Sequence, residues 1–355
     1  MATEMNSLSG GGDGGEAAKD ERPLLNSSSS NGSGETLEQL EKKYAAYVRK
    51  DAYGTMGRGK LAISEKVLLG IAIVTLVPIR FVAGVLILLV YYLICRFCTL
   101  FSVPNRDDGQ EDYAHMVGWR REVVVRCGRF SSRAMLFVFG FYWIRVDDRS
   151  LSTTEDEHGE QSDETERPGA IISNHVSYLD ILYHMSSSFP SFVAKRSVAR
   201  LPLVGLISKC LGCIYVQRES KASDFKGVSE GTTTNGDYLL PFKTGAFLAK
   251  APVLPLILRY PYKRFSPAWD SISGMRHVLL LLCQFMNHIE VVRLPVYYPS
   301  EQEKEDAKLY ANNVRKLMAT EGGLVLSDIG LAEKRVYHAA LNGNSLPRVL
   351  HQKDD

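Results

Sequence analysis

The sequence predicts an α/β fold, a mixed and mostly parallel sheet with helices on both faces, preceded by an N-terminal membrane-anchoring helix or helical hairpin. From Pro168 onward, short apolar runs typical of buried strands alternate with stretches of helical periodicity. Such alternation favours parallel strands joined by crossover helices. Upstream, residues 67–95 form an apolar stretch longer than the roughly 20 residues that cross a bilayer.

Composition divides the chain into five parts. Residues 1–36 are rich in Ser, Gly, Asn and acidic residues, so we expect a disordered tail. We expect a membrane-anchoring segment over residues 37–104, an interfacial helix and acidic linker over 105–167, and the α/β domain over 168–300. Residues 301–355 are expected to form a C-terminal helix and a tail, polar beyond Gly343.

The anchoring segment, Val67–Cys95, carries a single charge, Arg80. A charge at the centre of a membrane helix costs roughly 2.5 to 3.5 kcal/mol, and Pro78 removes a backbone donor. We therefore expect two halves, each short of a full span. A hairpin in one leaflet and a single tilted span both remain open. Basic residues before the segment and acidic residues after it place the N-terminus in the cytosol.

The region after the anchor is harder to assign. "AMLFVFGFYWI", residues 134–144, is too short to span a bilayer and rich in aromatics, which suits either the membrane interface or a core helix. Residues 152–166 are acidic and predict a loop.

Ten elements are expected in the remainder, alternating between the two types. The expected strands cover residues 169–173, 191–196, 213–218, 252–260 and 289–298, and the expected helices cover 177–188, 201–212, 244–250, 272–287 and 305–319.

Charge and cysteine content exclude some classes of protein. Forty-two basic against forty acidic residues give a net charge of +2, which argues against a dedicated nucleic-acid binder. Two CxxC pairs, Cys95/Cys98 and Cys210/Cys213, lack a nearby second pair of metal ligands. We expect buried structural thiols and no metal site.

The stretch "AIISNHVSYLD" contains the strongest candidate for chemistry. His175 follows an expected strand, and Asp180 falls in the first turns of the next helix. A histidine oriented by a carboxylate is a suitable general base, and functional groups of open α/β sheets gather beyond the carboxyl ends of strands. The same interval separates His158 from Asp163 in the acidic linker, without a strand before it, and we attribute that copy to chance. No GxSxG motif supports a serine hydrolase.

Four stretches give the sequence a family resemblance. "NHVSYLD", "GCIYVQR", "EGTTTNG" and "APVLPLIL" resemble, in this order, the four sequence blocks of glycerolipid acyltransferases, most closely the plant lysophosphatidylethanolamine acyltransferases. The resemblance implies that residues 168–300 are an acyltransferase domain. It implies transfer of an acyl group from acyl-CoA, a co-substrate, to the free hydroxyl of a lysophospholipid, with no further cofactor. It also implies phospholipid biosynthesis at the endoplasmic reticulum membrane, with the domain facing the cytosol.

By the same resemblance, His175 is the base that deprotonates the glycerol hydroxyl, and Asp180 orients it. Arg218 grips a phosphate of the acceptor, a task that suits a bidentate guanidinium. Lys195 is a second candidate for the phosphate charge, although a solvated lysine at a strand end is an equally good interpretation.

The third and fourth blocks contribute the acceptor site and its support. Glu230, Gly231 and Thr232 are implied to line the acceptor site, with Gly231 letting the backbone approach and Thr232 offering a hydroxyl. Pro255 is implied to shape the neighbouring strand.

The sequence departs from the family before the third block. Members of the family carry an apolar strand ending in Phe-Pro there, whereas this chain reads "KGVS", and only twenty residues run from Cys213 to Thr232. A strand, a crossover helix and a parallel strand need roughly 30 residues. We therefore predict that a helix and a strand are missing and that Glu230–Thr232 lie in an irregular loop. We also predict reduced or absent activity, and the alternative function is a catalytically impaired membrane-bound isoform.

Overall fold

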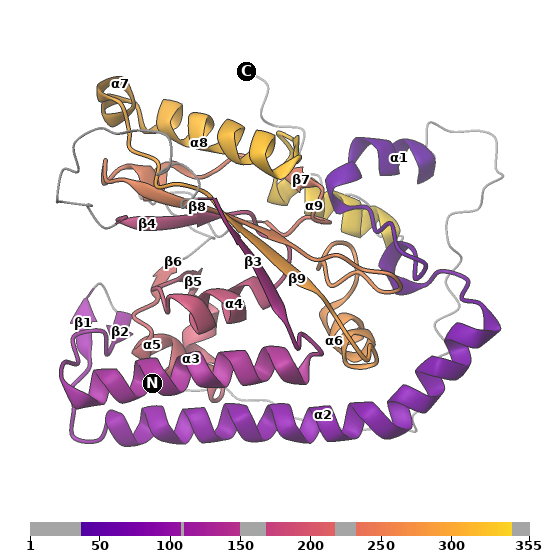
Figure 1. The fold of residues 1–355 in the computed structure, drawn as a ribbon, viewed down its shortest axis with the longest axis horizontal. Helices are drawn as coiled ribbons and strands as arrows, with labels where there is room; N and C mark the ends of the chain where they lie inside the picture. The colour runs from indigo at the N-terminus through magenta and orange to yellow at the C-terminus, as the bar shows by residue number, and fades with distance from the viewer. Residues whose placement is uncertain (1–36, 108–109, 150–167, 217–231, 343–355) are drawn as a thin grey trace, which may run out of the picture.

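The structure is a computed structural model and describes residues 37–107, 110–149, 168–216 and 232–342 (Figure 1). Its centre is a sheet of four strands in the order β3-β9-β8-β4. The pairs β3–β9 and β4–β8 are parallel and the pair β8–β9 is antiparallel, so the predicted mixed, mostly parallel sheet is confirmed. The strands are β3 (Ile144–Asp148), β4 (Ala170–Ser173), β8 (Val253–Arg259) and β9 (Ile289–Arg293).

Helices cover both faces of this sheet, as predicted (Figure 1). Side chains of β8 alternate between them: Val253 and Ile257 pack with α8 (Ala307–Gly322), while Leu256 and Leu258 pack with α4 (Leu179–Ser187) and α6 (Gly274–Leu282). This is the period-two burial of a strand between two layers. Helix α8 begins where the Asp306 carboxylate accepts the backbone N–H groups of Lys308 and Leu309.

Two short parallel pairs lie outside the central sheet. Strands β5 (Val193–Lys195) and β6 (Ile214–Val216) flank α5 (Val204–Cys210), and β7 (Tyr238–Leu239) pairs with β10 (Val325–Leu326). Among the described residues, β4 is an edge strand of the central sheet, and β5–β6 form a separate sheet.

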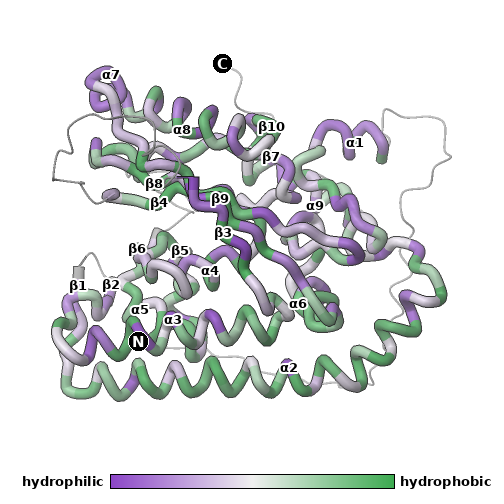
Figure 2. The backbone as a smooth tube through the Cα atoms, viewed as in Figure 1, coloured by the Kyte–Doolittle hydropathy of each residue, from purple (hydrophilic) through white to green (hydrophobic). Residues whose placement is uncertain are grey.

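The apolar anchor forms one helix, α2 (Ile63–Cys98), which is one of the two forms that the sequence left open; Pro78 and Arg80 do not divide it into halves. Figure 2 shows hydrophobic residues along nearly its whole length. At 1.5 Å per residue its 36 residues extend about 54 Å. Pro78 lies at an exposed position of this helix, which continues past it on both sides.

Arg80 is also accommodated without breaking the helix. Its guanidinium is buried and donates to the carbonyl oxygens of Leu282, Gln284 and Phe285 and to the hydroxyl of Tyr142. The charge that we expected to divide the segment therefore joins α2 to the end of α6.

Helix α2 packs along α3 (Trp119–Val138), which lies between it and α4 (Figure 1). Gly128 permits this approach, since a Cβ there would collide with the Tyr91 hydroxyl of α2 and the Phe189 ring. Helix α3 ends before Gly140, and the chain then enters β3.

The stretch over residues 134–144 is partly core and partly exposed, so it is not wholly a core helix, and its location at a membrane interface stays a prediction. Leu136 and Phe141 are buried in the core, while Phe137 and Trp143 are exposed. Strand β3, which follows directly, joins the central sheet through β9, a pairing between residues more than a hundred positions apart that local pattern does not reveal.

The cysteines lie in apolar surroundings. All six are free thiols, and Cys95, Cys98, Cys210 and Cys213 belong to one buried cluster between α2, α3 and α5.

The remaining elements are short or lie near the ends of the described chain. Tyr44 and Tyr47, which follow α1 (Leu37–Lys43), pack against Tyr337 of α9 (Leu331–Leu341). The others are a hairpin, β1 (Asn105–Asp107) and β2 (Gln110–Asp112), helix α7 (Glu301–Glu305), and four 3-10 turns, Ala45–Tyr47, Thr55–Gly57, Arg196–Arg200 and Thr244–Phe247.

Candidate active site

His175 lies just beyond the carboxyl end of β4, as the sequence predicts. The preceding Asn174 continues the pairing of β4 with β8, because its side chain accepts from Leu258 N at 2.8 Å and donates to Leu258 O at 2.9 Å. This two-point attachment fixes the backbone immediately before His175.

Asp180 lies in the first turn of α4 and meets the imidazole. Its Oδ2 is 2.8 Å from His175 Nδ1 and accepts the backbone N–H groups of Val176 and Ser177 at 2.8 and 3.0 Å. The carboxylate therefore holds the turn that precedes α4, and it lies at the N-terminus of this helix, where the helix dipole favours a negative charge. Its side chain is 4% exposed, whereas that of His175 is 27% exposed.

The contact between these two residues selects one tautomer of the imidazole. An ionised carboxylate can only accept, so Nδ1 carries the proton and Nε2 keeps a lone pair. Among the described residues, Nε2 has no hydrogen-bond partner. The site therefore presents an oriented base with one free nitrogen.

The second oxygen of Asp180 has a partner that the sequence did not suggest. The hydroxyl of Tyr260, one residue beyond β8, donates to Asp180 Oδ1 at 2.6 Å. Tyr260 is eighty residues from Asp180 and reaches it from the end of β8, so no motif spacing in the sequence predicted this contact.

A second histidine lies behind the pair and has a different environment. His184 is buried in α4, and its Nε2 contacts Ser173 Oγ at 3.2 Å. Burial lowers the pKa of His184, partly offset by the charge of Asp180, so the ring is neutral at physiological pH. It supports the core behind β4 and does not line the cavity.

An open cavity of about 380 Å³ begins at His175. Its walls are the end of β4, the loop with Thr232 and Thr234, the chain from β7 to the Thr244–Phe247 turn, and the residues at the start of α9. Most of these side chains are apolar. Lys243 on the exposed side of the cavity is a basic residue that we had not selected from the sequence.

The predicted acceptor-site residues are only partly described. Arg218, Glu230 and Gly231 lie outside the described residues, as do His158 and Asp163. Thr232 has no regular secondary structure and lines the cavity beside His175.

The other two residues are Lys195, the second candidate for the phosphate charge, which is not among the residues lining the cavity, and Pro255, implied to shape its strand. Lys195 is the last residue of β5 and pairs in register with Val216, and Pro255 lies in β8 opposite Ile172.

The loop after Thr232 is fixed by contacts with several parts of the fold. Thr234 N donates to His175 O at 3.1 Å, and Thr233 Oγ1 donates to Trp269 O at 2.7 Å. The side-chain amide of Asn235 donates to the carbonyl oxygens of Ala45 and Val48. This half of the third block is therefore anchored independently of the chain that precedes it.

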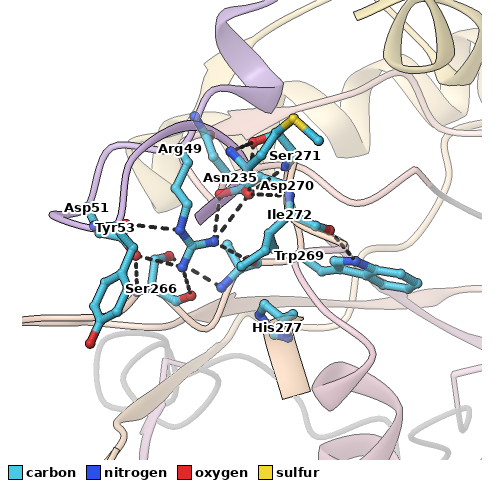
Figure 3. Close-up of polar contacts among 12 residues, drawn as sticks. Arg49, Asp51, Tyr53, Asn235, Ser266, Trp269, Asp270, Ser271, Ile272 and His277 are labelled. Atoms are coloured by element: carbon cyan, nitrogen blue, oxygen red, sulfur yellow. Dashed lines mark hydrogen bonds and ion pairs between the residues drawn. The ribbon is translucent and has the colours of Figure 1, made fainter. Parts of the chain in front are cut away.

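A buried ion cluster supports the same loop from behind (Figure 3). Arg49 pairs with Asp51 at 2.6 Å and Asp270 at 3.2 Å, and it also donates to the carbonyl oxygen of Ser266. Next to Asp270, Trp269 N donates to Val176 O at 2.9 Å. The cluster thus connects the N-terminal segment to the turn that carries His175.

Comparisons with known proteins identify the family of the chain. A sequence model of the Acyltransferase family matches residues 155–229, which include β4, α4 and the His175–Asp180 pair. The lysophospholipid acyltransferase LPEAT1 of Arabidopsis thaliana is 59% identical over 385 aligned positions, with 96% of each chain covered.

Two more distant similarities were found. The lysophosphatidylcholine acyltransferase of Drosophila melanogaster is 35% identical over 72% of this chain, which spans about half (49%) of that relative. The solved structure of the 1-acyl-sn-glycerophosphate acyltransferase PlsC from Thermotoga maritima is also similar, over 68% of this chain and 98% of that chain. The sequence identity is 17% and the TM-score is 0.35, so we draw no conclusion from this similarity. On the evidence of the nearly full-length relative, the chain belongs to the lysophospholipid acyltransferase family.

Proposed function

We propose that this protein transfers an acyl group from acyl-CoA to the free hydroxyl of a lysophospholipid, with His175 as the general base. Lysophosphatidylethanolamine and related lysolipids are the proposed acceptors. The observation that carries the proposal is the 2.8 Å contact between His175 Nδ1 and Asp180 Oδ2 at the mouth of the cavity.

The chemistry follows from the free nitrogen of the imidazole. His175 Nε2 takes the proton of the lysolipid hydroxyl as its oxygen attacks the thioester carbonyl carbon. The carbon–sulfur bond breaks, the new ester forms, and the proton passes from His175 to the departing CoA sulfur. Asp180 stabilises the imidazolium between these steps. No acyl-enzyme intermediate is needed.

The test is a comparison of two histidine variants in membranes. His175→Ala should lower acyl-CoA-dependent thiol release at least a thousandfold, with lysophosphatidylethanolamine as acceptor. His288→Ala removes an exposed histidine outside the cavity and should retain full activity. Wild-type turnover by His175→Ala would exclude the proposed base.

Lys243 is the proposed contact for the phosphate of the acceptor. It lies on the rim of the same cavity as His175, and no ion pair of Lys243 is present among the described residues. An ammonium suits a phosphate group as a point charge. The apolar walls suit the glycerol backbone and the chain beside it.

The short connection before Thr232 is the reason to expect that this chain is less active than its relative LPEAT1. The alignment with LPEAT1, at 385 positions, is longer than the 355 residues of this chain, so that relative has residues without a counterpart here. We propose that the missing residues are the helix and strand expected before the third block. The separation of β4 from β5–β6 supports this position.

The alternative, a membrane-bound isoform without turnover, has less support. The His175–Asp180 pair is assembled, and the loop from Thr233 to Asn235 is anchored by its own contacts. Both features support a protein that keeps its activity at a reduced rate.

We propose that α2 lies within one leaflet, with the domain on the cytosolic face of the endoplasmic reticulum. In the described part of the chain, α2 is the one helix long and apolar enough to span a membrane. It lies alongside α3 and is tied by Arg80 to α6, which opposes an isolated transverse span. Phe101, Phe130 and Trp143 are further apolar residues with largely exposed side chains, which suit contact with lipid.

Protease protection in intact microsomes tests this arrangement. Tags at the two ends should be cleaved from the same side, and alkaline carbonate should leave the protein in the membrane. Protection of one tag alone would establish a span.

A further inference from the structure

Asp180 is held on both of its oxygens, and the two sets of donors come from different parts of the fold. Oδ2 receives His175 Nδ1 and two backbone N–H groups, all within five residues of Asp180. Oδ1 receives the hydroxyl of Tyr260, eighty residues away, at 2.6 Å. The local donors hold one oxygen, and within the described parts of the chain Tyr260 alone donates to the other.

The position of Tyr260 is rigid. It follows β8 directly, and β8 pairs in parallel with β4, so both strands end at the same edge of the sheet. The side chain of Asn174 closes the pairing at Leu258, two residues before Tyr260. The ring is buried and meets Phe141 edge-on, with centroids 5.9 Å apart.

The hydroxyl acts as a donor. Burial raises the pKa of Tyr260 well above its usual value, and the negative charge of Asp180 raises it further. The phenol therefore stays protonated at physiological pH, and its one proton is directed at the carboxylate.

We infer that Tyr260 is a positioning residue of the acyl transfer, acting through Asp180 on His175. The inference rests on the proposed function. With Oδ1 fixed, the carboxylate keeps Oδ2 in line with Nδ1, and the imidazole cannot rotate away from the cavity. Tyr260 is not among the residues that line the cavity at His175. Its loss should therefore lower kcat and leave the KM of both substrates unchanged, because geometry at the reacting centre affects kcat more than uniform binding does.

The test needs variants that differ in hydrogen bonding and not in volume. Tyr260→Phe is the first, and Tyr310→Phe is its matched control: Tyr310 is also fully buried and donates to a carbonyl, that of Ala251, near the other end of β8. We expect kcat about tenfold lower for Tyr260→Phe, KM within twofold, and a kcat within twofold of wild type for Tyr310→Phe.

If Tyr260→Phe does not fold, two other variants at the same position test the inference. Tyr260→4-aminophenylalanine keeps a donor on a ring of the same size, whereas Tyr260→4-methylphenylalanine fills the same space without one. The amino variant should keep kcat within about threefold of wild type, and the methyl variant should lose about tenfold. Equal kcat for these two folded variants would overturn the role of Tyr260.

The outcomes separate this inference from the proposed function. If His175→Ala is inactive but all Tyr260 variants turn over at the wild-type rate, only the role of Tyr260 is wrong. If His175→Ala is fully active, the proposed function fails first.

Discussion

Arg80 Nη1, in the middle of α2, donates to the carbonyl oxygen of Leu282, the last residue of α6, at 2.9 Å. The carbonyls at the end of a helix lack intrahelical partners, and a cation placed there is favoured by the helix dipole. Two further carbonyls, of Gln284 and Phe285, complete the contact. The residue that makes the anchor unfavourable as a simple membrane span is therefore the residue that attaches it to the domain.

Replacing Arg80 should destabilise the protein without releasing it from the membrane. Arg80→Met leaves three carbonyls without their donor, two of them in buried hydrogen bonds, and each unmade buried bond costs roughly 1 kcal/mol or more. We expect the free energy of unfolding in detergent to fall by about 2 to 4 kcal/mol. Arg96→Met, at an exposed position of the same helix, is the control and should change it by less than about 0.5 kcal/mol. Equal stability of the two variants would show that the contact is dispensable.

Asp180→Asn should lower kcat by about two to four orders of magnitude. The amide can donate to Nδ1, which favours the tautomer with its proton on Nε2 and removes the free lone pair. Steady-state rates of CoA release measure the effect. Asp306→Asn, at the capping residue of α8, is the control and should keep the wild-type rate. A wild-type rate for Asp180→Asn would contradict the orienting role.

Lys243→Ala should raise the KM for the lysophospholipid about five- to twentyfold and leave the KM for acyl-CoA unchanged. The expected loss, about 1 to 2 kcal/mol, is that of one exposed charge-assisted contact. Lys250→Ala removes a nearby exposed lysine outside the cavity lining and should change neither value. A rise in the KM for acyl-CoA alone would assign Lys243 to the other substrate.

Inserting the helix and strand that we propose are missing before the third block should increase turnover.

 The donor sequence is the corresponding segment of Arabidopsis LPEAT1, whose alignment exceeds the length of this chain. A restored strand beside β4 should bring the third block to the geometry that catalysis requires, within about half an ångström. We expect kcat at least tenfold above that of the present chain, measured by thiol release at equal protein in the membrane. Equal turnover by both versions would show that the short connection is harmless.

The free energy of unfolding of the domain should decrease as the pH is lowered, because His277 is buried in its neutral form. Burial lowers the pKa of His277 to about 3, with a smaller effect from the charge of Arg49, while the unfolded chain titrates near 6.5. Between these values the unfolded state binds the extra proton, so stability falls as pH falls, with a limiting slope of about 1.4 kcal/mol per pH unit. His277 Nε2 contacts Pro267 O at 3.1 Å, which a glutamine amide can replace.

Urea unfolding at pH 6.5 and pH 5 measures this effect. The loss of unfolding free energy on acidification should be smaller in His277→Gln than in wild type by roughly 1 to 2 kcal/mol. His288→Gln, at an exposed histidine, should keep the wild-type loss. If His277→Gln also keeps it, another group carries the acid sensitivity.

The sequence by itself determined the fold class, the apolar anchor and the pair at the end of β4. Strands and helices within the α/β part follow from hydrophobic period, and His175 and Asp180 lie five residues apart on a strand end and a helix start, so their meeting is a local event. The same local reasoning did not predict that the helix continues through Pro78 and Arg80. It considered only the cost of these residues in lipid and could not include the contact of Arg80 with the end of α6.

Only the tertiary structure decided which distant groups complete these features. Strand β3 enters the sheet through β9, Tyr260 reaches Asp180 from the end of β8, and Arg80 finds the carbonyls of α6. Each contact joins residues eighty or more positions apart, and each depends on how two packed elements lie against one another. Hydrophobic period and motif spacing describe single elements, so they carry no information about those pairings.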